Sequence, residues 1–237
     1  MKLAGKKIVA IGGTSGIGLA VAKAAMDEGA EVFAGSSKAA NLDKAKASIG
    51  DRLSGATIDA TDEASVAAFF EQAGEFDHLV YTAGDWGDRS PKKITDYQAS
   101  DFTDLIAVRF SGALLAIKHG VSRMREGGSI VLTGGMVAHR PRKGAPMATV
   151  MAGTVESLVQ SLAVDLAPVR VNAVCPGAIA TDVWGDNAAE QFRGFTDPLP
   201  ISRLGDPAEV AEAYLYLMKG GYTTGTVAVV DGGKLLI

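Results

Sequence analysis

The chain has 237 residues, of which 47% are hydrophobic and 21% charged, and this composition excludes a disordered chain and a coiled coil. The length favours a single domain of the larger α/β kind. The 23 basic and 27 acidic residues leave a formal net charge of −4, which argues against a broad cationic surface for nucleic acid or an anionic membrane.

Cysteine and histidine are too few and too scattered for a metal centre. Cys175 is the only cysteine, so the sequence excludes an internal disulfide and a multi-cysteine site, and a reducing cytoplasm fits. The histidines show no ligand spacing: His78, His119 and His139. The first apolar run is too short for a signal peptide, and no uninterrupted apolar stretch approaches the roughly 18 residues of a membrane span. We therefore expect a cytoplasmic protein with no metal, no membrane span and no nucleic-acid partner.

Short apolar runs alternate with longer segments of helical periodicity, which is the pattern of βα units and a parallel sheet. The runs cover residues 8–11, 32–34, 56–58, 78–81, 129–133, 169–174 and 227–230. Helical segments cover residues 17–28, 64–72 and 148–166, and a further helix begins after Asp206-Pro207, where Asp suits the N-cap and Pro the first turn. The pattern predicts one α/β domain over residues 1–237. Its core is a doubly wound parallel sheet of seven strands with helices on both faces.

Each of two polar segments has two possible roles. Residues 184–204 are rich in turn formers and lie between the sixth strand and the last helix. They are either a lid over a site or a passive surface loop. Residues 139–143 (His-Arg-Pro-Arg-Lys) concentrate positive charge. They either attract an acidic substrate or form a solvated loop.

A glycine-rich turn joins the first strand to the first helix. In Gly12-Gly13-Thr14-Ser15-Gly16-Ile17-Gly18, the first glycine permits a tight turn, Gly16 lets the backbone approach a phosphate, and Gly18 lets helix and strand pack closely. The helix N-terminus adds amide donors and a positive dipole. The spacing is G-x-x-x-G-x-G, and a turn without a ligand is the alternative. We predict that a dinucleotide pyrophosphate is held by Gly12, Thr14, Ser15, Gly16, Ile17 and Gly18.

The residues after the second strand favour NADP(H) over NAD(H). An NAD enzyme of this architecture places Asp or Glu about 20 residues past the glycines, where it bonds the ribose 2′-hydroxyl. This chain has Gly35-Ser36-Ser37-Lys38 there. Two hydroxyls and an ammonium can donate to a 2′-phosphate, and no carboxylate repels it. The alternative is that Lys38 is a solvated loop lysine.

Further motifs follow in order along the chain. Asp59-Ala60 follows the third strand, Thr82-Ala83-Gly84 follows the fourth, and V-N-A-V-C-P-G at residues 171–177 precedes Thr181. Together with the glycine turn, they resemble the short-chain dehydrogenase/reductase family over nearly the whole chain. The resemblance implies a Rossmann-like fold, a small-molecule substrate, and homodimers or homotetramers. It also implies that the cofactor is contacted by Asp59, Ala60, Ala83, Gly84, Pro176, Gly177 and Thr181.

The catalytic residues that the resemblance implies do not carry over. Family members use a Ser, a Tyr and a Lys, with an Asn on the preceding long helix. Alignment on Ser161–Pro168 and on the fifth strand places Gly135, Ala148 and Ala152 at the Ser, Tyr and Lys positions. Arg109 stands at the Asn position. Alanine and glycine carry no exchangeable side-chain proton, so the usual general acid is absent and the catalytic residues are unknown.

Two residues are candidates for a replacement role. His139 could donate a proton near neutral pH, or it is a solvated loop histidine. Arg109 could clamp an oxyanion or a substrate carboxylate, or it forms a structural ion pair with an acid such as Asp104. A tyrosine such as Tyr81 or Tyr97 reaching the vacated space would overturn this interpretation.

Two functions from different classes follow. The first is an NADP(H)-dependent oxidoreductase of a small carbonyl or conjugated substrate, with water, the substrate or His139 supplying the proton. The second is a catalytically silent NADP(H)-binding module, either a redox sensor or the inactive partner of an active paralogue. A weaker third is an isomerase or lyase that uses the cofactor only as structure. We favour the enzyme.

Overall fold

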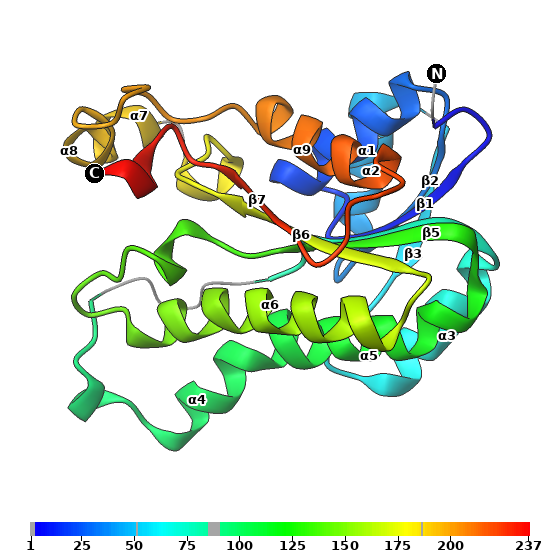
Figure 1. The fold of residues 1–237 in the computed structure, drawn as a ribbon, viewed down its shortest axis with the longest axis horizontal. Helices are drawn as coiled ribbons and strands as arrows, with labels where there is room; N and C mark the ends of the chain where they lie inside the picture. The colour runs from blue at the N-terminus through cyan, green and yellow to red at the C-terminus, as the bar shows by residue number, and fades with distance from the viewer. Residues whose placement is uncertain (1–2, 51, 85–90, 186) are drawn as a thin grey trace.

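A parallel sheet of seven strands forms the centre of the molecule in a computed structural model, which describes residues 3–50, 52–84, 91–185 and 187–237 (Figure 1). The strands are β1 (Lys7–Ile11), β2 (Glu31–Ser36), β3 (Leu53–Thr57), β4 (Phe76–Tyr81), β5 (Met124–Thr133), β6 (Arg170–Pro176) and β7 (Val227–Val230). They lie in the order β3-β2-β1-β4-β5-β6-β7, and every neighbouring pair is parallel. The predicted doubly wound, Rossmann-like sheet is confirmed.

The third strand shares the fewest residues with its predicted position. The sequence places it at residues 56–58, whereas β3 covers Leu53–Thr57. This strand forms one edge of the sheet, and of its residues only Leu53 is buried. An apolar run is therefore a weak signal here, because an edge strand does not need one.

Helices cover both faces of the sheet. They are α1 (Gly16–Asp27), α2 (Ala39–Ile49), α3 (Glu63–Ala73), α4 (Ala99–Ile106), α5 (Gly112–Gly120), α6 (Pro146–Asp165), α7 (Ala188–Gln191), α8 (Arg193–Thr196) and α9 (Pro207–Lys219). Figure 1 shows α1, α2 and α9 on one face and α3, α5 and α6 on the other. The predicted start of the last helix is confirmed, because the Asp206 carboxylate accepts from the Ala208 amide at 2.7 Å.

The order of the strands creates a crevice at the end of the sheet where β1 and β4 finish. β1 and β4 are neighbours, although β2 and β3 come between them in the chain. The chain leaves β1 towards one face and β4 towards the other, so the two following loops diverge. Ligands of open α/β sheets bind at such a point, beyond the carboxyl ends of the strands.

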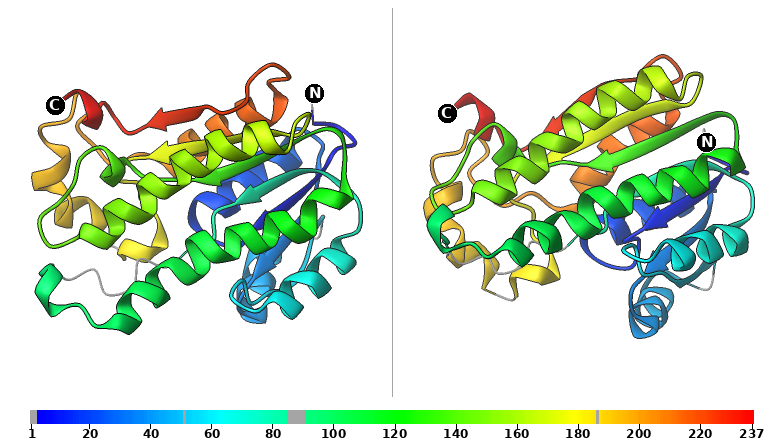
Figure 2. Two further views of the ribbon diagram at one scale, coloured as in Figure 1. Left: turned by 60° about the horizontal axis from the view of Figure 1, so that its bottom comes forward. Right: turned by 90° about the horizontal axis from the view of Figure 1, so that it is seen from below.

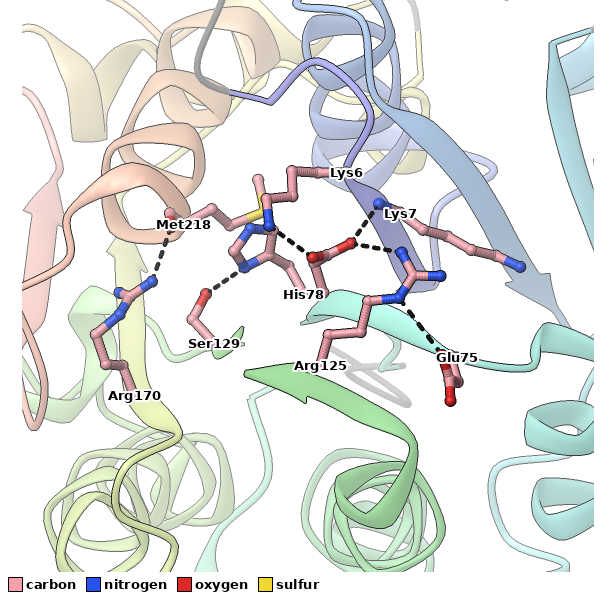
Figure 3. Close-up of polar contacts among 9 residues, drawn as sticks. Lys6, Lys7, Glu75, His78, Arg125, Ser129, Arg170 and Met218 are labelled. Atoms are coloured by element: carbon pink, nitrogen blue, oxygen red, sulfur yellow. Dashed lines mark hydrogen bonds and ion pairs between the residues drawn. The ribbon is translucent and has the colours of Figure 1, made fainter. Parts of the chain in front are cut away.

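The opposite end of the sheet, where the strands begin, holds a partly buried polar network (Figure 3). The Asp77 carboxylate accepts from Lys6 Nζ at 2.8 Å and from Arg125 Nη1 at 3.2 Å. Beside it, His78 Nδ1 lies 2.9 Å from Ser129 Oγ, and both side chains are buried. This network ties the starts of the central strands together at the edge away from the crevice.

Two helical stretches are long and apolar enough to cross a membrane by length and composition alone, Ala99–Arg123 and Pro146–Asp165. The sequence shows no uninterrupted apolar run, but the mean hydropathy of both stretches reaches 1.3. Each contributes residues to the core on one side, and α6 exposes Val150 and Val164 on the other, at 54% and 81%. Helices that cover a sheet pass the same test, so the expectation of no membrane span stays a prediction.

Candidate active site

A cleft of about 1200 Å³ runs along the carboxyl edge of the sheet. Its lining includes every residue that the sequence predicts to contact the cofactor, namely Gly12, Thr14, Ser15, Gly16, Ile17, Gly18, Ser36, Ser37, Lys38, Asp59, Ala60, Ala83, Gly84, Pro176, Gly177 and Thr181. These residues follow different strands and are brought together only by the sheet. We call the part lined by them the nucleotide half of the cleft.

The glycine turn has the backbone shape that its sequence requires. Gly12 has φ +86°, and a Cβ there would lie 2.6 Å from the backbone nitrogen of Ala83. A Cβ on Gly18 would lie 2.2 Å from the Gly12 carbonyl oxygen. Both positions therefore exclude a side chain, and they hold the loops after β1 and β4 in direct contact.

The N-terminus of α1 opens onto this turn. Ser15 is the N-cap of the helix, and its side chain makes no capping hydrogen bond. The first turn of α1 carries no acidic side chain. The hydroxyl and the first amides of the helix can therefore donate to an anion beside Gly16, which is the arrangement that binds phosphate in many nucleotide-binding proteins.

A second polar group lies where β2 ends. Ser36 is buried, its Oγ accepts weakly from the Lys38 amide at 3.4 Å, and Ser37 and Lys38 are exposed beside the cleft. Asn41, which the sequence analysis did not single out, also lines the cleft from the first turn of α2. Hydrogen bonds from the side chain and amide of Thr61 hold the pKa of the Asp59 carboxyl below its usual value. Asp59 thus brings one negative charge to this half.

The other end of the cleft contains the positions assigned to the family's catalytic set. Gly135 and Ala148 line it, whereas Ala152 is buried within α6 and is not among the described lining residues. Arg109 also lines the cleft, from a π-helical turn (Ala107–Ser111) between α4 and α5. A Cβ on Gly84 would lie 2.5 Å from Arg109 Cγ, so the absence of a side chain at residue 84 makes room for the arginine. π-helical turns occur frequently at functional sites.

His139 is not among the described residues that line the cleft. Its Nε2 lies 2.6 Å from Glu156 Oε1 on α6, and the two form an ion pair when the imidazole is protonated. Cys175 Sγ lies within 4.8 Å of both groups. Burial raises the pKa of the Cys175 thiol to about 12, which favours the neutral thiol over a metal-binding thiolate. The sequence expectation of no metal site stays a prediction.

The two tyrosines named as alternatives lie in different places. Tyr81 is buried, and its hydroxyl donates to the Val108 carbonyl oxygen at 2.5 Å. Tyr97 lines the cleft, and its ring stacks on Phe102 with centroids 5.6 Å apart. Lys92, whose amide donates to the Gly144 carbonyl at 2.9 Å, carries its Nζ 5.0 Å from the centre of the Tyr97 ring. Tyr97 is therefore a phenol in the same cleft as Ala148.

Three of the described residues in the segment at 184–204 line the cleft, and both the lid and the surface-loop interpretation stay open. The segment folds into α7 and α8 and lies at the same end of the molecule as the C-terminal segment (Figure 2). Trp184, Phe192 and Phe195 line the cleft, with ring centroids 4.6 Å apart for the first pair and 6.3 Å apart for the second. Sequence reasoning missed the two phenylalanines, for which their spacing of three residues was the only available signal.

Comparison with known proteins decides the family. A family model described as "Enoyl-(Acyl carrier protein) reductase" matches residues 11–234. The short-chain dehydrogenase/reductase ucsE of Acremonium sp. is 38% identical to this chain, covering 99% of it and 97% of that protein. The chain belongs to the short-chain dehydrogenase/reductase family. It is thus an oxidoreductase by type, of a family that binds nicotinamide cofactors.

Solved structures of this family superpose on the whole chain. "MalC Reductase/Diels-Alderase from Malbranchea aurantiaca" is 32% identical, with a TM-score of 0.91, and the match covers 100% of this chain and 98% of that one. A small-chain dehydrogenase crystallised in complex with NADPH is 33% identical, with a TM-score of 0.81, and the match covers 98% of this chain and 99% of that one. The family resemblance stated from the sequence motifs is confirmed.

Proposed function

We propose that this member of the short-chain dehydrogenase/reductase family is an NADPH-dependent reductase of a small carbonyl or conjugated substrate, acting without the family's usual Ser, Tyr and Lys. One observation carries the proposal. The complete nucleotide half and the side-chain-poor positions Gly135 and Ala148 line the same cleft.

The residues of the nucleotide half fit a dinucleotide phosphate. Gly12 and Gly18 leave no room for a Cβ, so the backbone itself can approach the pyrophosphate beside Ser15. Ser37 and Lys38 would hold the 2′-phosphate, because hydroxyl and ammonium groups donate to its oxygens. The relative crystallised with NADPH supports this preference.

The substrate end supplies charge rather than a proton. When bound, the reduced nicotinamide supplies a hydride. Arg109 would stabilise the negative charge that develops on the substrate oxygen, but a guanidinium does not release its proton usefully. His139 lies outside the described lining and bonds to Glu156. The proton would therefore come from water or from the substrate. If Tyr97, which lines the same cleft, supplies it instead, this residue takes the place of the family's tyrosine and the proposed route is wrong.

A substrate panel tests the proposal. NADPH oxidation is followed with ketones, aldehydes, quinones and enones, using a Gly18→Val variant as the control that has lost the cofactor site. Turnover of at least one class by the parent protein, and none by the variant, is expected. Tyr97→Phe separates the proton sources, because loss of a positioned acid lowers kcat by about 10²–10⁴-fold. Binding of NADPH without turnover of any compound would favour the silent module instead.

A second activity has one observation in its favour. The structure of MalC, titled a reductase/Diels-Alderase, has the same fold across the whole chain. Ring closure by cycloaddition moves no proton, so a shaped cleft that orients the diene suffices. Product formation from a diene substrate with NADP⁺ bound, at a rate above the uncatalysed reaction, would support this activity.

We also propose that the chain works in the cytoplasm as a homodimer or homotetramer. The support for the assembly is the exposed apolar side of α6, where Val150 and Val164 face outward. Burying such a surface against a second copy removes apolar area from water.

A further inference from the structure

One wall of the cleft is built from aromatic rings that are themselves half-exposed. Trp184 and Phe195 each contact Phe192 edge to face, and all three line the cleft. The half-buried thioethers of Met136 and Met147 line the cleft as well. Rings and thioethers favour contact with another ring, and the thioether adapts its shape to a ligand. We call this part, with the positions below, the substrate half of the cleft.

The positions assigned to the Ser and the Tyr widen this half. Gly135 has no side chain, and Ala148 carries only a methyl group. Both line the cleft with Met136 and Met147, their neighbours in the chain. A ligand in this half therefore meets rings and thioethers together with two positions that carry no large side chain.

The charges of the substrate half have one sign in the part of the chain that the structure describes. Its charged lining residues are the cations Arg109, Arg140, Arg142 and Lys234. Asp59 and Asp182 belong to the nucleotide half, because Asp59 follows β3 and Asp182 adjoins Thr181, whose methyl group lies 3.2 Å from a Cβ placed on Gly16.

These cations are not equally available to a ligand. Arg140 donates from Nε to the Ile237 carbonyl oxygen at 2.9 Å and from Nη2 to the Leu235 carbonyl oxygen. It therefore ties the loop before α6 to the C-terminal segment. Lys234 lies over the Phe195 ring, with Nζ 5.1 Å from its centre, so one charge sits directly beside the aromatic wall. Arg142 is exposed at the mouth of the cleft.

We infer that the substrate half takes a ring-bearing anion, an aromatic or fused-ring molecule with a carboxylate or sulfonate-like group. The rings lie against Phe192 and Trp184, and the anionic group faces Lys234 and Arg142. This inference rests on the proposed function only in assigning the other half to the cofactor.

Two fluorescent probes with the same ring system test it. 8-Anilinonaphthalene-1-sulfonate carries the anion, and N-phenyl-1-naphthylamine is its uncharged counterpart. Both are titrated into protein saturated with NADP⁺, so that the nucleotide half is filled. One-to-one binding is expected, with the sulfonate bound about fivefold more tightly, because partly exposed cations contribute modestly. Equal affinities, or no saturable binding of either probe, would overturn the inference.

Variants separate the contribution of the rings from that of the charges. Phe192→Ala should lower the affinity for both probes by about tenfold, whereas Arg142→Gln and Lys234→Gln should lower the affinity for the sulfonate only. Matched controls are Tyr222→Ala, at a fully exposed ring outside the cleft lining, and Lys23→Gln on the surface of α1. Phe192→Leu serves where the alanine variant unfolds. If Phe192 only stabilises α7 and α8, its replacement lowers the melting temperature without changing probe affinity, and the inference is wrong.

The outcome is independent of turnover. Probe binding to the NADP⁺ complex without any reductase activity would refute the proposed function and leave the inference standing. Reductase activity in a protein that binds the two probes equally would overturn the inference and leave the proposed function standing.

Discussion

Acid stability offers a sharp quantitative test of the structure, through His78. Its imidazole is 4% exposed, at the start of β4. Burial, together with the charges of Arg170 and Lys6 and against the opposing effect of Asp77, lowers the pKa of His78 from its usual 6.5 to about 4. The folded protein therefore keeps this ring neutral in a range where the unfolded chain protonates it.

The sign and the size of the effect follow from this difference. Between pH 6.5 and about 4 the unfolded state binds more protons, so the free energy of unfolding falls as the pH falls. The contribution is complete above the unfolded pKa and lost below the folded one. At about 1.4 kcal/mol per pH unit, the full difference is about 3 kcal/mol. From pH 7 to 4.5 it amounts to about 2 kcal/mol.

Urea unfolding of the parent protein and of His78→Asn between pH 7 and 4.5 measures this contribution. The asparagine keeps a hydrogen-bonding group for Ser129 Oγ but does not titrate. Its packing cost is the same at every pH, and His119 and His139 are common to both proteins, so the difference between the two curves isolates His78. Hydrogen bonds and charges from Lys6, Lys7 and Arg125 outweigh burial and lower the pKa of Asp77 from 3.8, so its loss falls below this range. Curves that stay parallel within about 0.5 kcal/mol would refute the reasoning.

Three further outcomes are expected. Gly18→Val removes the thermal stabilisation by NADPH, because a Cβ there would lie 2.2 Å from a carbonyl oxygen. If the variant keeps its circular dichroism and is still fully stabilised by NADPH, the assignment of the nucleotide half is wrong. Lys38→Ala lowers the affinity for NADPH by about tenfold in calorimetric titration and the affinity for NADH by less than about twofold. Equal losses of affinity for the two cofactors would rule out the contact with the 2′-phosphate. Val164→Glu, at a side chain 81% exposed on α6, lowers the mass measured by light scattering; an unchanged mass for this variant and for Val150→Glu rejects the α6 interface.

The family motifs were readable from the sequence because each depends on local backbone geometry. Gly12 and Gly16 have positive φ, which a side chain disfavours, so these two positions of the turn require glycine. The N-cap at Asp206 is equally local. The edge strand β3 and the helix α2 were harder to place, because only Leu53 in the first and Leu42 and Ala45 in the second are buried.

The sequence by itself determined the alternation of strand and helix and the position of the glycine turn, and it predicted that Gly135, Ala148 and Ala152 stand at the family's Ser, Tyr and Lys positions. Tertiary structure decided which side chains meet. In the fold, Arg109 packs against Gly84, His139 bonds to Glu156, and Phe192 lines the cleft. The physical reason is that such contacts depend on the order in which the strands pair and on the direction of each side chain. Neither property is contained in a local pattern of residues.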